Sequence, residues 1–81
     1  MQLQWPSRGL VLVDVDERRL KVVGEALLER CPDFLIFPEY ITHWEDGAPL
    51  DPERKRELLA EIIEEAGKRG WIFEIREGER P

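Results

Sequence analysis

The chain has 81 residues, enough for one domain with a modest core, and its 18 acidic and 12 basic residues give a formal charge of −6. An acidic chain lacks the basic surface that displaces counterions from phosphates, so this composition argues against nucleic-acid binding. We expect a single domain over residues 1–81, with an ordered core over about 9–76 and a charged tail at 77–81.

Cysteine usage and hydropathy indicate the compartment. The single Cys31 excludes an intrachain disulfide, which is typical of a reducing environment. The apolar runs are too short to cross a membrane, and the N-terminus shows no signal-peptide pattern. We therefore expect a cytoplasmic protein. Arginine outnumbers lysine nine to three, asparagine is absent, and Ser and Thr occur once each. Charged residues in place of thermolabile polar ones are typical of thermophilic proteins, and a GC-rich genome explains the bias equally well.

The first regular pattern predicts a β-hairpin. Residues 9–16, GLVLVDVD, alternate in side-chain direction, with Val11 and Val13 on one face. A tight polar turn at 16–18 leads into RRLKVVG, residues 18–24, which reads as a second strand. The two strands are close enough in sequence to pair directly, although the turn lacks the Asn-Gly signature.

Three short elements are predicted next. GEALLERC, residues 24–31, has the composition of a short helix, which Pro32 ends because the residue before a proline avoids the helical region. FLIF, residues 34–37, predicts a strand buried on both faces. EYITHW, residues 39–44, alternates and predicts a fourth strand.

The region after residue 50 predicts a long helix and a last strand. Asp51 is a natural N-cap and Pro52 a natural first residue for a helix over about 52–69. Its apolar residues recur at helical spacing: Leu58, Leu59, Ile62, Ile63 and Ala66. WIFEI, residues 71–75, predicts a terminal strand with Trp71 in the core.

These elements together predict an α+β fold. We expect a small, mostly antiparallel sheet of about four to five strands, covered on one face by one long amphipathic helix.

His43 is the residue most suited to acid–base chemistry, because its ordinary pKa lies near neutrality. A small hydrolase using His43 is therefore one interpretation, but no catalytic partner is evident and we predict no catalytic residue. One cysteine and one histidine do not make a zinc site, and the glycines occur singly. We predict no metal-binding residue and no cofactor.

Tryptophans and acids give the candidate partner-binding residues. The stretch HWEDGAPLDP, residues 43–52, holds His43, Trp44, Glu45 and Asp46 just before the long helix. Trp44 either closes the rim of the core or anchors a partner, since tryptophan is enriched in binding hot spots. Trp5 either packs onto the sheet or marks an interface.

Several segments in chain order resemble one protein family, the immunity protein 74 family of bacterial polymorphic toxin systems. The resemblance covers roughly residues 9–76, and no segment is specific alone. The segments are LKVVGEALLE at 20–29, FLIF at 34–37, ITHW at 41–44, EDGAPLDPERKRELLAEI at 45–62 and GWIFEI at 70–75.

The resemblance implies a non-catalytic module that binds and neutralises a toxin domain. The acidic surface would suit a basic toxin, such as a nuclease. A small homo-oligomeric structural or regulatory module is the alternative, in which exposed edge strands pair between subunits. The family resemblance also implies that 43–52 is a strand-to-helix corner, which Trp44 secures and Gly47 and Pro49 turn.

Overall fold

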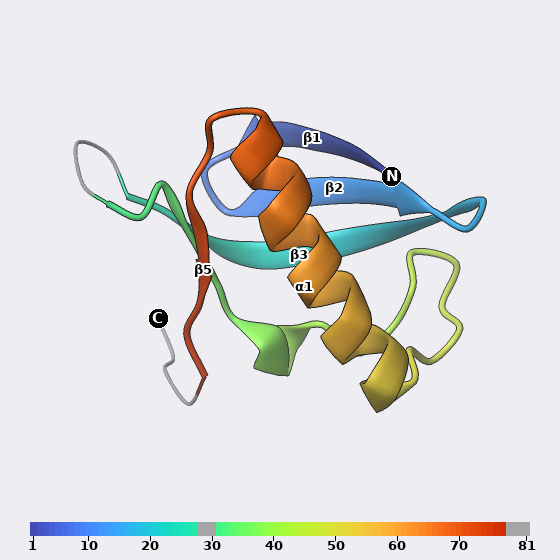
Figure 1. The fold of residues 1–81 in the computed structure, drawn as a ribbon. Coiled ribbons are helices and arrows are strands. Elements are labelled where there is room, and N and C mark those ends of the chain that lie inside the picture. Colours follow the sequence, from blue (N-terminus) through green and yellow to red (C-terminus); the bar gives the residue numbers. More distant parts are fainter. Residues whose placement is uncertain (28–30, 78–81) are drawn as a thin grey trace.

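A computed structural model describes residues 1–27 and 31–77. Within these residues one sheet has the strand order β1-β2-β3-β4-β5, and a single long helix, α1, crosses one of its faces (Figure 1). The β4–β5 pair is parallel and the other neighbouring pairs are antiparallel. The elements are β1 (Gln2–Ser7), β2 (Leu10–Val15), β3 (Arg18–Ala26), β4 (Phe34–Ile36), the 3-10 helix η1 (Pro38–Tyr40), α1 (Pro52–Lys68) and β5 (Phe73–Ile75). The predicted fold class is confirmed.

The β2–β3 hairpin forms as predicted. Val11 pairs with Val22 and Val13 with Leu20, and all four side chains are buried under α1. The turn residues that join the strands, Asp16 and Glu17, have φ angles of 54° and 59°. Positive φ at both central residues matches the right-handed twist of paired strands, so the hairpin closes tightly without a glycine.

β1 is a strand that the sequence prediction left outside its elements. It pairs antiparallel with β2, and its register shifts between Gln4 and Ser7. Leu3 is buried in the core, while Pro6 lies in the irregular part of the strand. A proline is tolerated there because an edge strand can spare one backbone donor.

The helix predicted over 24–31 is wrong in its first part, because residues 24–26 belong to β3. A Cβ on Gly24 would lie 2.0 Å from the Leu35 carbonyl oxygen and 2.6 Å from the Phe34 ring. The backbones of β3 and β4 therefore approach closely at a glycine, and this contact overrides the helical composition. Residues 28–30 of the predicted helix lie outside the described residues.

The strand predicted over 39–44 is also wrong. Residues 38–40 form η1, with Pro38 at its first position, and Ile41 donates its backbone N–H to the Pro38 carbonyl at 3.0 Å. Proline suits the start of a helix because its φ is already helical. After this turn, only an isolated bridge joins His43 to Pro49.

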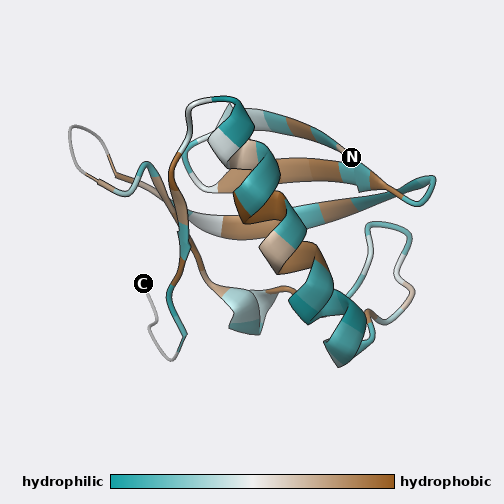
Figure 2. Cartoon of the chain, viewed as in Figure 1, coloured by the Kyte–Doolittle hydropathy of each residue, from teal (hydrophilic) through white to brown (hydrophobic). Residues whose placement is uncertain are grey.

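The long helix is confirmed, and it ends one residue earlier than predicted. The Asp51 side chain accepts a hydrogen bond from the Arg54 N–H at 3.2 Å, as an N-cap should. Gly70, just beyond the helix, has a φ of 80°, a conformation that glycine adopts without strain. The apolar stripe of α1 faces the sheet (Figure 2), with Leu58, Leu59, Ile62 and Ala66 buried.

An aromatic cluster closes the end of the core beside β5. The Trp5 ring lies edge-on to Phe34, Trp71 and Phe73, with centroids 5.4–5.5 Å apart. Trp71 precedes β5 and is half-buried against the core, and its backbone N–H donates to the Ala66 carbonyl. Edge-on ring pairs add to the burial energy, so Trp5 joins β1 to β4 and β5.

Candidate partner-binding surface

Residues 43–51 form a corner loop between η1 and α1, which folds back on itself. The Trp44 N–H donates to the Ala48 carbonyl at 2.8 Å, and the Gly47 N–H donates to the Trp44 carbonyl at 2.9 Å. Gly47 has a φ of 92°, where a side chain would be strained. His43 and Pro49 face each other across the bridge. These contacts give the loop a defined shape.

Trp44 secures the corner loop from beneath. Its side chain is only 6% exposed and belongs to the hydrophobic core. The Arg18 guanidinium stacks over the ring, 4.7 Å from its centroid. Arg18 also makes an ion pair with Asp46 at 3.1 Å. Trp44 therefore lies at the rim of the core, and Arg18 ties the hairpin to the loop above it.

Two further contacts join the corner loop, the hairpin and the start of α1. The Glu45 N–H donates to the Arg19 carbonyl at 2.9 Å, so the loop continues the edge of the hairpin. At the turn, Asp16 accepts a hydrogen bond from Arg54 of α1 at 2.6 Å. Three segments that are distant in sequence thus share one polar surface.

Hydrogen bonds lower the pKa of two carboxylates of this surface, Asp46 and Asp14. The Ala48 backbone N–H, at 2.8 Å from Asp46 Oδ1, and then Arg18 hold the pKa of Asp46 below its ordinary value. The Arg19 guanidinium, 2.8 Å from Asp14 Oδ1, similarly lowers the pKa of Asp14. Both shifts have the same physical cause, since a donor or cation stabilises the charged form of an acid.

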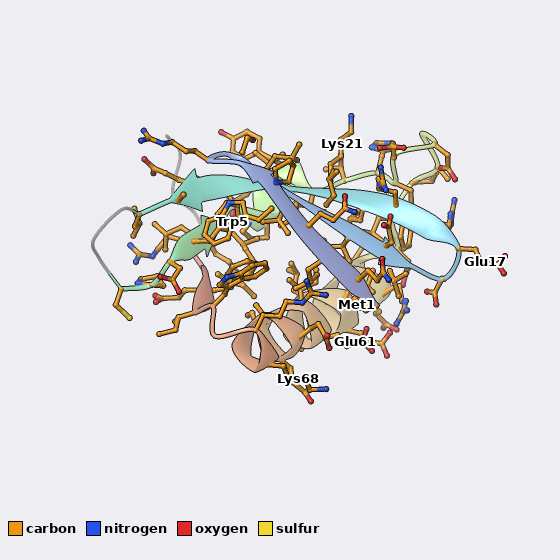
Figure 3. The ribbon with its side chains drawn as sticks, turned by 90° about the horizontal axis from the view of Figure 1, so that it is seen from above. Met1, Trp5, Glu17, Lys21, Glu61 and Lys68 are labelled. Carbon is orange, nitrogen blue, oxygen red and sulfur yellow. The ribbon has the colours of Figure 1, made fainter. Side chains whose placement is uncertain are left out.

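The polar surface contains two adjoining hollows that share Met1, Val15 and Asp16. Figure 3 shows Glu17 projecting at the end of the hairpin, and Met1 beside Glu61 of α1. Charged side chains dominate both hollows. The first is also lined by Asp14, Glu17, Arg18, Arg19, Glu45 and Asp46, and the second by Arg54, Glu61, Glu64, Glu65 and Lys68. Eight acidic and four basic side chains thus line the two hollows.

Four of the five predicted partner-binding residues lie on the corner loop, and three of them are exposed. His43, Glu45 and Asp46 are exposed on the corner loop, and Trp44 supports them from below. Trp5 belongs instead to the aromatic cluster. His43 Nδ1 lies 2.9 Å from the Thr42 hydroxyl, a hydrogen bond between sequence neighbours at an exposed position.

Sequence analysis missed the hairpin's share of this surface. Arg18, Asp16 and Arg54 each make a contact with a residue 28 or 38 positions away. Charge pairs at such separations leave no periodic signal in one sequence. The polar turn at 16–18 was identified, but its position beside the corner loop depends on the packing of Trp44 and α1.

The comparison with protein families concerns nearly the whole chain. The family described as immunity protein 74 matches residues 5–76, which include the last part of β1, all of β2 to β5 and the long helix. This chain belongs to the immunity protein 74 family. The resemblance of its ordered segments to that family is thereby confirmed. No curated protein and no solved structure matches the chain.

Two further observations accompany the immunity protein 74 assignment. Across residues 1–27 and 31–77, no helix combines the length and apolar character needed to cross a membrane. In the same part of the chain, no group of three or more His, Cys, Asp or Glu side chains is arranged to hold a metal ion.

Proposed function

We propose that this protein binds and neutralises a toxin domain without turning over a substrate. The observation that carries the proposal is the match of the immunity protein 74 family over residues 5–76. The formal charge of −6 supports a basic toxin as the partner, since complementary charge accelerates encounter and rejects wrong partners.

The corner loop and the hairpin turn supply the proposed contact surface. Glu45 and Asp46 are exposed on the loop, and Glu17 is exposed at the turn beside them. The ion pair between Arg18 and Asp46 holds the loop in place before a partner arrives. A surface that is already ordered loses little side-chain entropy on binding, so it favours tight association.

His43, Glu45 and Asp46 would contact the toxin directly, whereas Trp44 and Trp5 would act from within. Trp44 is buried under Arg18, and Trp5 is half-buried among aromatic rings. Removing the Trp44 ring would therefore change the shape of the surface, whereas removing the Trp5 ring would disturb the aromatic cluster beside β5. We expect His43→Ala to change affinity modestly and Trp44→Ala to weaken both stability and binding.

Co-expression with a toxin domain encoded beside the gene tests the proposal. The protein should protect the cells and co-purify with the toxin. The association rate should fall as salt rises, because exposed charges are screened over about 10 Å at 0.1 M ionic strength. If the protein neither binds nor protects against a toxin shown to be active, the immunity function is wrong.

A charge-reversal pair locates the contact surface. Glu17→Lys combined with Glu45→Lys should slow association by about tenfold or more at low salt. Glu74→Lys alters an exposed acid on β5, away from the corner loop (Figure 1), and should have a much smaller effect. Equal slowing per reversed charge would place the toxin elsewhere. A hydrolytic activity that His43→Ala abolishes would replace binding with catalysis.

A further inference from the structure

The face of the sheet that points away from α1 carries an ordered pattern of side chains. Leu10 and Leu12 of β2 point to this face, because Val11 and Val13 between them are buried under the helix. In β3 the outward positions are Lys21, Val23 and Glu25, and Figure 3 shows Lys21 pointing away from α1. The strand register sets Leu10 beside Val23 and Leu12 beside Lys21.

The centre of this open face is apolar and its edge is aromatic. Val23 is 37% exposed and Tyr40 is 47% exposed. Phe37 connects them, because its N–H bonds to the Val23 carbonyl at 3.2 Å and its ring lies edge-on to Tyr40. Leu35, beside Glu25, and Phe37 are buried but lie outside the principal core. An apolar centre with a polar rim is the usual anatomy of a protein interface.

The charges on this face balance and are symmetrically placed. Lys21 and Glu25 lie on either side of Val23, each about 7 Å away along the strand. Asp14 and Arg19, the remaining charged pair facing outward on β2 and β3, neutralise each other at 2.8 Å. Two acids and two bases thus share the open face of these strands, on a chain of net charge −6. Two copies that meet at this face would therefore bring together surfaces without net charge, rather than two acidic surfaces that repel each other.

We propose that a second copy of this chain docks on the open face. The two-fold axis lies midway between the two sheets, perpendicular to β3 and level with Val23, so it reverses the strand direction. Lys21 of each copy then meets Glu25 of the other, and the Val23 and Leu10 side chains pack on their symmetry mates. Sheets stacked face to face lie about 10 Å apart, which a lysine and a glutamate side chain span together.

The edges of the sheet are less suited to a second copy. The Leu3 carbonyl on the outer edge of β1 already accepts a hydrogen bond from Arg69 Nη1 at 2.9 Å. Pro6 removes a further donor from the same strand. At the other edge, β5 contains three residues. Occupied, proline-containing and short edges are the means by which proteins prevent strand pairing, whereas the open face offers apolar area.

Sedimentation velocity over a concentration series tests this dimer with the protein alone, independently of any toxin. The wild type should show a reversible monomer–dimer equilibrium. Lys21→Glu and Glu25→Lys should each weaken dimerisation by about tenfold or more, because like charges then meet twice. The double variant should regain the wild-type dissociation constant to within about threefold, because both cross-pairs form again with reversed polarity.

Glu57→Lys on α1 is the matched control, since it makes the same charge change as Glu25→Lys on an exposed side chain of the helix. It should leave the dimer unchanged, and circular dichroism should show that every variant is folded. A wild type that remains monomeric up to about 1 mM, the concentration range of very weak association, would overturn the proposal. A double variant that dimerises no more tightly than the single variants would also overturn the proposal. If the protein is monomeric and Val23→Lys abolishes toxin binding, the open face belongs to the toxin instead.

Discussion

Replacing Ile62 tests how α1 is seated on the sheet. This side chain is fully buried, in the same cluster as Leu58 of α1 and Val11 and Val22 of the sheet. Ile62→Ala removes three buried carbons, which corresponds to about 2.4 kcal/mol at about 0.8 kcal/mol for each methylene. The cavity that remains adds to this loss, so we expect a total of about 3–4 kcal/mol, within the range of such substitutions.

Urea denaturation followed by circular dichroism gives the free energy of unfolding. The neighbouring Glu61 is exposed, so Glu61→Ala should cost less than about 0.5 kcal/mol. Ile62→Val, which leaves a smaller cavity, should cost about 0.5–1.5 kcal/mol and provides a measurable variant if the alanine form does not fold. If Ile62→Val and Glu61→Ala unfolded at the same midpoint and slope, the helix would be facing the wrong way.

Three other substitutions test local features by the same measurement. Gly24→Ala should destabilise the protein by at least about 2 kcal/mol, because the added Cβ would clash with β4. Gly67→Ala, where the added Cβ meets nothing on α1, should stabilise the protein by about 0.5–1 kcal/mol. If Gly24→Ala were the more stable of the two variants, the close contact between β3 and β4 would be wrong. Asp51→Ala should cost about 0.5–2 kcal/mol through the lost N-cap, and an unchanged midpoint would place the start of the helix elsewhere. The Ala48 amide, and then Arg18, hold the pKa of Asp46 below its ordinary value of 3.8. The stabilisation from ionised Asp46 is therefore present above pH 3.8 and is lost as the pH falls through the lower pKa of the folded state. Asp46→Asn should reduce this loss of stability in acid, and an unchanged pH profile would show that the Asp46–Ala48 hydrogen bond does not form.

The hairpin and the long helix were predictable because their signals are local. Alternation around Val11 and Val13 and the helical spacing of Leu58 and Ile62 each define a buried face without reference to the rest of the chain. The helix start was equally local, because Asp51 and the proline that follows it act on adjacent backbone. Such patterns are sufficient to predict the two layers of the fold.

The wrong predictions have non-local causes. Residues 24–26 have helical composition, yet they pair with β4 as part of β3, and the Leu35 carbonyl leaves no room for a side chain at Gly24. β1 is stabilised by Leu3 in the core and by Trp5 in the aromatic cluster, and neither contact is visible from the sequence around it. Tertiary packing decides such segments.

Part of the candidate surface was predictable, because the sequence signal for the corner loop is also local. The corner loop was recognised from the run of distinctive residues before the helix, and His43, Glu45 and Asp46 are indeed exposed there. The contribution of Arg18 depends on a ring that lies 26 positions away in the chain, at Trp44. Only the folded arrangement reveals that the hairpin turn belongs to the same surface.

The parallel pairing of β4 with β5 has a consequence for the order of folding. These strands are joined through η1, the corner loop and α1, so their contact closes a far longer segment than the turn between β2 and β3. Closing a longer segment costs more chain entropy before any contact compensates for it. The β2–β3 hairpin is therefore expected to form early and β5 to dock last, so backbone amides of β5 should exchange with solvent before those of Val11 and Val22.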